Sequence, residues 1–267
     1  MTNLLEVSGL GKSFSRPALR RRTTAAAKAV DDVSFVVPRG RSVAVVGESG
    51  AGKSTVGRLV LRLIDPDEGT VRFDGVELTT LSPARMREMR RRMQMVFQDP
   101  YSCLNPRMTI LDSIAEPLLV HGLGTRPERE AKAAAMLDRV GLGARFARRH
   151  PVELSGGQLQ RVAIARALVV EPDFVVCDEP TAALDVSVQA QVLELLGEMQ
   201  RDLGLALLFI THHLALVEVI ADDVLVMRRG RVVEQGPVTQ VLHAPRGEYT
   251  RDLLAAVPSP IPRALRG

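Results

Sequence analysis

The sequence predicts an α/β protein whose core is interrupted by a block of helices, and three observations support this fold class. Short β-rich runs open the chain at residues 4–7, 32–37 and 41–46, and the third is apolar enough for a strand buried on both faces. Helical patterns dominate from about residue 109 to residue 168. Strands and helices alternate again after Pro172, so the two parts of the core are separated in the sequence.

One helix and one hairpin complete the first part of the core. Apolar residues recur at helical spacing over residues 53–64, and the turn sequence at residues 65–69 ends this helix. Residues 70–73 and 76–78, joined by Asp74-Gly75, predict a β-hairpin. Together with the early strands, these elements predict a β-rich first part of the chain.

Further elements follow from the same patterns along the rest of the chain. We expect helices at 110–121, 127–140, 155–170, 186–203 and 214–221, strands at 174–177 and 205–211, and a hairpin at 224–233 that turns at Gly230. The β-rich segments and the α/β core therefore span about 1–97 and 170–245, and the helical block spans about 98–169. Residues 246–267 close the chain, and from about Pro258 onward they predict a loose tail rich in Pro and Arg.

An arginine-rich run at 85–92 has Met86, Met89 and Met93 on one helical face. It is either a membrane-surface helix or a solvated helix whose methionines pack on the core, and the second alternative is favoured.

The bulk composition excludes some classes of function. The formal net charge is +4, but aromatic residues make up only 3% of the chain, so platforms for stacking bases are scarce and no nucleic-acid partner is expected. Cys103 and Cys177 lack the C-x-x-C spacing of zinc or iron–sulfur sites, and a reduced cytosolic setting fits them best. No apolar run approaches the roughly 20 residues of a membrane span. Any work at a membrane would need another, membrane-spanning chain.

A glycine-rich loop lies between the buried strand at 41–46 and the helix that follows. It matches the phosphate-binding pattern G-x-x-x-x-G-K-S and comprises Gly47, Glu48, Ser49, Gly50, Ala51, Gly52, Lys53, Ser54 and Thr55. Inward-facing backbone N–H groups and the helix dipole bind phosphate, Lys53 bridges β- and γ-phosphate oxygens, and Ser54 coordinates Mg²⁺. A glycine-rich turn that only caps a helix is the alternative; it is disfavoured because one of only four lysines occupies the required position. The loop predicts binding of ATP and Mg²⁺.

Two adjacent carboxylates, Asp178 and Glu179, follow the apolar run at 174–177. Adjacent side chains leave a strand end in different directions, so the two can have different roles. Asp178 is expected to hold Mg²⁺ through its hydration shell, and Glu179 to orient or deprotonate the water that attacks the γ-phosphate. Such a strand end is structural about as often as it is functional, but a phosphate-binding loop upstream favours function.

A second helix in the chain begins with features of an anion-binding site. Leu154 is followed by Ser155, a plausible N-cap, and then by Gly156, Gly157 and Gln158. The glycines expose N–H groups, yet the first loop already encloses its own phosphates. A second ATP, bound to a partner molecule, explains this second helix start. The sequence therefore predicts a head-to-tail pair that holds two ATP molecules between the chains.

Six segments in this order resemble the ATP-binding-cassette ATPases, and the resemblance covers nearly the whole chain: the phosphate-binding loop, Gln98, Leu154 to Gln158, Asp178-Glu179, Ala183-Leu184-Asp185, and His212. It implies a RecA-like P-loop NTPase core with an antiparallel β subdomain and an inserted helical subdomain. It also implies that Gln98 reaches Mg²⁺ and water and couples to a membrane partner, that Asp185 crosses the dimer interface, and that His212 contacts the γ-phosphate. Without the other motifs, a histidine that follows a strand would more often have a structural role, with its hydrogen bonds made within the fold.

Two positions are less regular. An aromatic ring stacks on adenine in this family, and Phe14 is the candidate, with packing in the core as its alternative. Where the family often has Asp after the switch histidine, this chain has His213; His212 itself is retained, so hydrolysis is expected to survive.

The stretch from Phe97 to Thr109 resembles the dipeptide, oligopeptide and nickel importer ATPases, and Tyr249 to Pro258 is similar to their closing helix, although Arg246-Gly247-Glu248 replaces the usual His-Pro. This resemblance implies an ATPase on the cytoplasmic face of the membrane. Its partners would be a second cassette, identical or not, permease subunits and an extracytoplasmic solute-binding protein. The expected cargo is a di- or oligopeptide, with nickel or another solute as the alternative. DNA-repair and translation ATPases are less favoured, because the chain has one cassette and no coiled-coil insertion.

Overall fold

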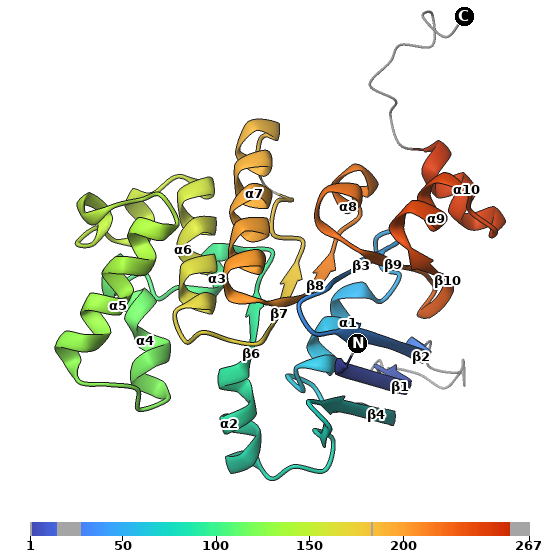
Figure 1. Cartoon of the computed structure of the whole chain (residues 1–267), viewed down its shortest axis with the longest axis horizontal. Helices are drawn as coiled ribbons and strands as arrows, with labels where there is room; N and C mark the ends of the chain where they lie inside the picture. Colours follow the sequence, from blue (N-terminus) through green and yellow to red (C-terminus); the bar gives the residue numbers. More distant parts are fainter. Residues whose placement is uncertain (1, 15–27, 183, 257–267) are drawn as a thin grey trace, which may run out of the picture.

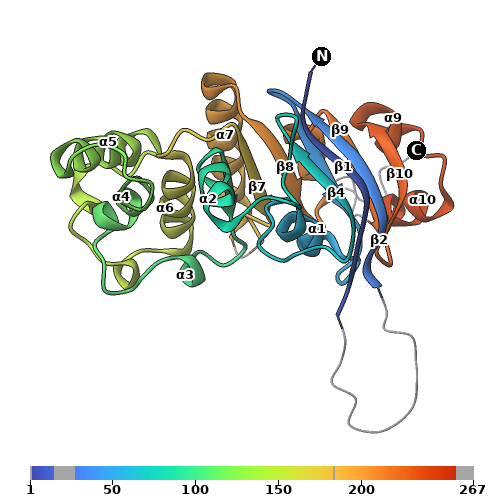
Figure 2. The same ribbon diagram turned by 90° about the horizontal axis from the view of Figure 1, so that it is seen from below.

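Two β-sheets and a set of surrounding helices make up the computed structural model, which describes residues 2–14, 28–182 and 184–256 (Figures 1 and 2). The strands are β1 (Asn3–Ser13), β2 (Lys28–Pro38), β3 (Ser42–Val46), β4 (Glu68–Phe73), β5 (Val76–Glu77), β6 (Met93–Val96), β7 (Phe174–Asp178), β8 (Ala206–Ile210), β9 (Asp223–Arg228) and β10 (Arg231–Pro237). The helices are α1 (Lys53–Val60), α2 (Pro83–Arg92), α3 (Pro100–Cys103), α4 (Ile110–Val120), α5 (Arg126–Arg139), α6 (Gly156–Leu168), α7 (Val186–Leu203), α8 (Leu214–Ile220), α9 (Val238–His243) and α10 (Glu248–Ala255). Short 3₁₀ helices at Ala144–Phe146 and Pro151–Glu153 lie between α5 and α6.

The larger sheet has the strand order β10-β9-β3-β8-β7-β6. Strands β9, β3, β8, β7 and β6 are parallel to one another, and β10 pairs antiparallel with β9. The carboxyl ends of parallel strands share one edge, where ligands bind in open α/β sheets. The segments that follow β3, β6, β7 and β8 therefore meet at this edge, although they are far apart in the sequence.

The two faces of the larger sheet are covered by different layers. On β3, Val43 and Val45 share a buried cluster with α1 and with the antiparallel sheet of order β2-β1-β4-β5. Ala44 and Val46 belong to the opposite cluster, with residues of α8 and α9. This alternation buries β3 on both faces, which explains its continuous apolar run.

Helices α4, α5 and α6 form the inserted block, at the left of Figure 1. Their apolar faces meet in a buried cluster that includes Ile114, Leu137 and Val162 and continues into α7 and strands β7 and β8. The block is thus packed against the sheet edge that carries β6 and β7.

Most expected elements are confirmed, and helix 186–203 has the bounds that the periodicity predicts. Helix α1, however, ends at Val60 rather than at residue 64. The reason is local: Arg62 adopts a left-handed φ of 47°, and its guanidinium donates to the Leu78 and Leu81 carbonyls. The predicted helix therefore stops one turn early.

The methionine run is partly corrected. Met86 is buried in α2 and Met89 packs against the same cluster, so the core-facing alternative is confirmed. Met93 is not on the helix. It begins β6, a strand that the sequence did not predict, and pairs with Phe174 of β7.

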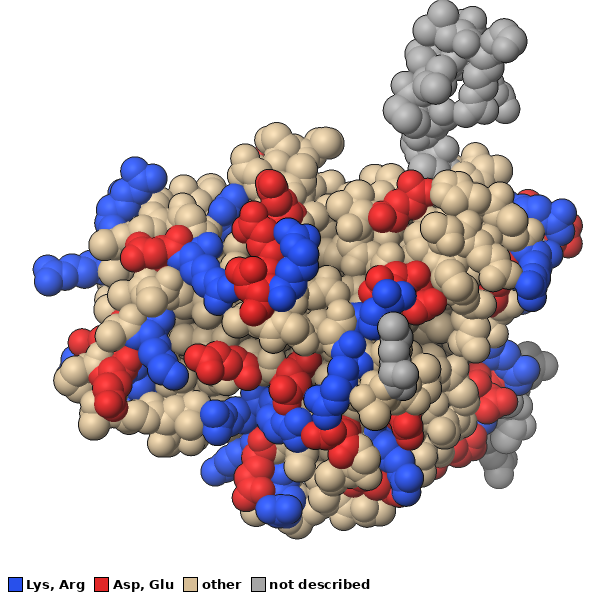
Figure 3. Space-filling view, in the orientation of Figure 1, with Lys and Arg blue, Asp and Glu red and all other residues tan. Residues whose placement is uncertain are grey.

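Charged side chains of both signs are interspersed across the face shown in Figure 3. Arg92, for example, contacts Asp74 at 2.7 Å and Asp173 at 2.5 Å, which ties α2 to both sheets. Within residues 2–14, 28–182 and 184–256, no helix combines the length and the apolar character needed to cross a membrane.

Candidate functional site

A cavity opens at the carboxyl edge of the larger sheet, between β3 and α1. It is lined by Phe14, Ala29, Ser49, Gly50, Gly52, Lys53, Ser54, Thr55, Gln98 and Glu179. Residues predicted from three separate motifs therefore surround one space. Phe14 is 53% exposed, so the alternative that it packs in the core is wrong, and its ring instead borders the cavity.

The phosphate-binding loop fits closely against neighbouring backbone. A Cβ atom at Gly47 would lie 2.2 Å from the Met227 carbonyl oxygen, and one at Gly52 would lie 2.2 Å from the Ala29 carbonyl oxygen. Both glycines also have positive φ, at 146° and 100°. Only glycine meets both demands, because larger residues strain at such φ values and would collide with the backbone.

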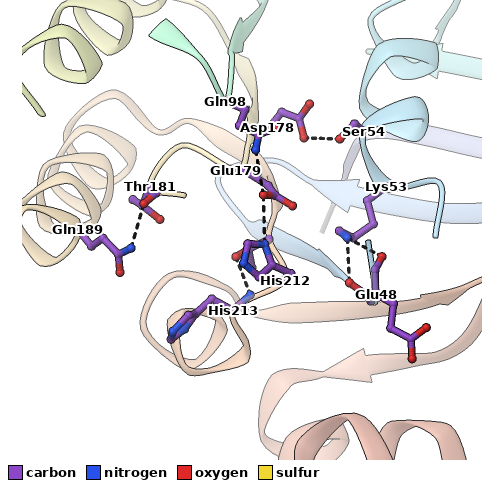
Figure 4. A network of polar contacts seen from close by, with 12 residues as sticks. Glu48, Lys53, Ser54, Gln98, Asp178, Glu179, Thr181, Gln189, His212 and His213 are labelled. Atoms are coloured by element: carbon purple, nitrogen blue, oxygen red, sulfur yellow. Dashed lines mark hydrogen bonds and ion pairs between the residues drawn. The ribbon is translucent and has the colours of Figure 1, made fainter. Parts of the chain in front are cut away.

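Lys53 is buried and folds back into its own loop. Its Nζ donates to the carbonyl oxygens of Gly47 at 2.8 Å and Glu48 at 3.0 Å (Figure 4). Burial lowers the pKa of the Lys53 ammonium group, whereas the nearby carboxylates of Glu179 and Asp178 act in the opposite direction. The cation is thus held by two carbonyls of its own loop at the wall of the cavity.

Ser54 and Asp178 meet at the edge of the cavity. The Ser54 hydroxyl donates to Asp178 Oδ1 at 2.7 Å, and Asp178 is buried at the end of β7. Burial raises the pKa of the Asp178 carboxyl, although the Ser54 hydrogen bond opposes this shift. A hydroxyl and a carboxylate side by side are hard oxygen donors, so the residues present fit Mg²⁺.

Glu179 points away from Asp178 and toward β8 and β6. Its Oε2 lies 3.1 Å from His212 Nδ1 and 3.4 Å from Gln98 Nε2 (Figure 4). The backbone of Glu179 has a φ of 45°, a left-handed conformation that costs free energy in a residue other than glycine. Its N–H donates to the Ile210 carbonyl at 2.9 Å, which holds this conformation in place.

One side chain of this region, Gln189, was not singled out from sequence. Gln189 of α7 donates through Nε2 to the carbonyls of Thr181 at 2.9 Å and Leu184 at 3.1 Å, so it fixes the loop after Glu179. This clamp has no sequence signature, since a polar residue in a helix is common. His213 is exposed, and its ring points away from Glu179 in Figure 4, whereas His212 contacts that carboxylate.

The start of α6 does not share this cavity. Ser155 and Gln158 form a capping box: the Ser155 N–H donates to Gln158 Oε1 at 3.0 Å, and the Gln158 N–H donates to Ser155 Oγ at 3.4 Å. Ser155 and Gly156 are exposed and Gly157 is half-buried. None of these residues lines the cavity that the described residues enclose.

Asp185 is also outside the cavity and is the N-cap of α7. Its carboxylate accepts from the Val188 N–H at 3.0 Å and from the Ser187 hydroxyl at 2.7 Å. The Ser187 hydrogen bond is the main reason that the pKa of Asp185 lies below its usual range. An acidic residue directly before a helix is a capping signal, so this second role was visible in the sequence. Ala183, two residues earlier in the same motif, lies outside the described residues.

The chain is similar in sequence to a known protein family and to ATP-binding proteins named for import. The ABC transporter family matches residues 30–182 of the chain. A peptide import ATP-binding protein of Brucella ovis is 49% identical over 263 residues, which cover 98% of this chain and 81% of that protein. The glutathione import ATP-binding protein GsiA of Pectobacterium atrosepticum is 48% identical over 96% of this chain, which matches 41% of its length.

A solved structure, the dimeric ATP-binding cassette MJ0796 in a post-hydrolysis state bound to ADP and Pi, is also similar. The TM-score is 0.78 at 29% sequence identity, over 88% of this chain and 98% of that one. The likeness confirms the predicted P-loop NTPase fold class.

Proposed function

The chain belongs to the ABC transporter family, and from this membership we propose that it is the ATP-hydrolysing subunit of an importer for di- or oligopeptides. The chain is an ATPase, as its family and its likeness to a cassette bound to ADP and Pi indicate. The peptide cargo is supported by two relatives at 48–49% identity, one named for peptide import and the other for import of glutathione, itself a tripeptide.

One observation carries the mechanism: the Glu179 carboxylate is shared by His212 and Gln98 beside the Ser54–Asp178 pair. Glu179 orients or deprotonates the attacking water, His212 contacts the γ-phosphate, and Gln98 helps to position the water. Lys53 and the loop N–H groups hold the phosphates. Ser54, Asp178 and Gln98 would hold Mg²⁺, which neutralises charge on the phosphates when bound. Phe14 offers its ring to the adenine base.

The second helix start supports a paired arrangement. Within the capping box of Ser155 and Gln158, the N–H groups of Gly156 and Gly157 are presented to a γ-phosphate held by a partner cassette. Asp185 crosses the same interface. The pair works with permease subunits and an extracytoplasmic solute-binding protein, at the cytoplasmic face of the membrane. Closure of the pair moves the permeases, and hydrolysis resets it.

We also propose a division of the chain that fits this mechanism. The β subdomain and P-loop core comprise about 1–97 and 170–245, and the helical subdomain about 98–169. Residues 246–267 are the closing helix and tail of the oligopeptide-type importers, and those from 257 onward lie outside the described residues.

Replacing Glu179 with Gln tests the catalytic assignment. The substitution keeps the shape of the side chain but removes its charge and basicity, so turnover should fall about 10²- to 10⁴-fold while ATP binding is retained. ATPase rates and a fluorescent-ATP titration measure the two effects. Glu218→Gln is a matched control, because Glu218 is an exposed carboxylate paired with His243 on another surface. A Glu179→Gln chain that hydrolysed ATP at the normal rate would remove Glu179 from this role.

The cargo requires the assembled transporter. We expect peptides presented with the solute-binding protein to stimulate ATP turnover in membrane vesicles that contain the chain and its co-encoded permeases. Free amino acids and nickel ions serve as comparisons. Stimulation by nickel but not by any peptide would contradict the peptide assignment and leave the ATPase assignment intact.

A further inference from the structure

The closing helix α10 reaches the outer side of the phosphate-binding loop. The Glu48 N–H donates to the Tyr249 hydroxyl oxygen at 3.4 Å, across 201 positions of sequence. This N–H belongs to the peptide group that joins Gly47 to Glu48. The carbonyl of the same peptide group, on Gly47, accepts from Lys53 Nζ at 2.8 Å. One peptide group therefore connects α10 to the buried lysine of the site.

The geometry of a trans peptide explains why both contacts can exist together. Its C=O and N–H bonds point in opposite directions in one plane. Lys53 takes the inner side of the Gly47–Glu48 peptide, and Tyr249 takes the outer side. A rotation of this peptide would break both hydrogen bonds, so each contact fixes the orientation on which the other depends.

Tyr249 is itself held by two neighbours. The Arg228 guanidinium carbon lies 4.7 Å from the centroid of the Tyr249 ring, and Arg228 ends β9. At the start of the segment, the Glu234 carboxylate of β10 accepts from the N–H groups of Arg246 at 2.8 Å and Gly247 at 3.1 Å. The side chain is thus supported by the hairpin of β9 and β10 rather than projecting freely from the surface.

The same hairpin touches the loop a second time. Gly47 lies so close to β9 that an added Cβ atom would be 2.2 Å from the Met227 carbonyl oxygen. Met227 directly precedes Arg228. The beginning of the loop is therefore enclosed by β9 on one side and by Tyr249 on another.

We propose that Tyr249 is a positioning residue for the phosphate-binding loop, an inference that rests on the proposed function of Lys53. Its hydroxyl oxygen accepts a hydrogen bond from the Glu48 N–H. This contact fixes the orientation of the peptide group that holds Lys53 before nucleotide binds. A loop that is already ordered loses less conformational entropy when the ligand binds, so the entropic cost of binding is lower. The closing segment of the chain, beyond residues 30–182 where the family matches, thereby sets the affinity of the site for ATP.

The variant Tyr249→Phe tests this inference on the full chain. It removes the hydroxyl but keeps the ring over Arg228, so α10 should stay docked and the thermal midpoint should be unchanged. We expect the Kd for fluorescent ATP to rise about threefold, equivalent to about 0.65 kcal/mol, which is the size of one net hydrogen bond. We also expect KM to rise while kcat stays constant, and the Glu48 amide to exchange its hydrogen faster in the nucleotide-free chain.

Tyr101→Phe is the matched control. It removes the chain's other tyrosine hydroxyl, on an exposed side chain of α3 whose hydroxyl makes no hydrogen bond to the described residues. ATP affinity and Glu48 exchange should stay as in the unaltered chain. If Tyr249→Phe bound ATP with unchanged affinity and Glu48 exchanged at its original rate, this inference would be overturned and the proposed function would stand. An unaltered chain that bound no ATP would overturn both.

Discussion

Two helix beginnings, those of α1 and α6, share a glycine-rich start but differ in how their N–H groups are satisfied. The N-cap of α1 is Gly52, which has no side chain to accept a hydrogen bond. The N-cap of α6 is Ser155, which forms a reciprocal capping box with Gln158. Since uncapped N–H groups at a helix start need an acceptor, α1 is built to receive one from a ligand.

The starts of α1 and α6 also differ in what surrounds them. Helix α1 begins with the buried Lys53 and faces the carboxylates of Asp178 and Glu179, so its partners come from one chain. The start of α6, by contrast, is exposed, with Ser155 and Gly156 open to solvent. One half of a nucleotide site is therefore complete within the chain, and the exposed start of α6 is the half that we propose meets the nucleotide of a second cassette.

The largest expected effect separates these two halves. Lys53→Ala removes the buried cation, so ATP binding by the isolated chain should weaken at least about 100-fold. Gly156→Asp puts a negative charge where the partner's γ-phosphate is expected, and it fits sterically, because an added Cβ at Gly156 is 3.7 Å from Leu184. It should leave ATP binding by the isolated chain within about twofold but lower turnover of the assembled transporter about 10³-fold.

Nucleotide titration of the single chain and ATPase assays of the complex distinguish the two variants. Loss of nucleotide binding by the isolated, folded Gly156→Asp chain would contradict the view that α6 serves the partner's nucleotide.

A smaller effect is expected within the complete half. His212→Ala removes the imidazole that lies 3.1 Å from Glu179 Oε2, and turnover should fall about 10²-fold. His213→Ala is the matched control, because the His213 ring points away from the site (Figure 4). Its turnover should stay within about threefold of the unaltered complex. Equal losses in the two variants would assign His213 a role that the structure does not give it.

The complete half was also the more predictable from sequence. The phosphate-binding loop is contiguous, and Asp178 and Glu179 are adjacent, so residue type and spacing were sufficient to find them. The parallel sheet then dictates that the ends of β3 and β7 lie at one edge. What the sequence does not carry is the left-handed backbone of Glu179, which turns its carboxylate toward His212.

Non-local contacts explain most of what was missed. Strand β6 has four residues after a run of arginines, which is too short for a period to appear, and its pairing with β7 decides its conformation. Gln189 and Tyr249 act through backbone groups of distant segments. Backbone partners leave no pattern of residue types, so single-sequence reasoning could not identify them.

The smallest effect concerns Asp185, which connects the two halves of the comparison because it has a visible role within the chain and a proposed role across the interface. Asp185→Ala removes the N-cap of α7, so the chain should become less stable and its thermal midpoint should fall by about 2–4 °C. Asp185→Asn can still accept the Val188 N–H and should keep the original midpoint. Because Asn lacks the charge, turnover of the assembled complex should fall in both variants if the carboxylate crosses the interface. Normal turnover of Asp185→Asn at unchanged stability would reduce Asp185 to a helix cap.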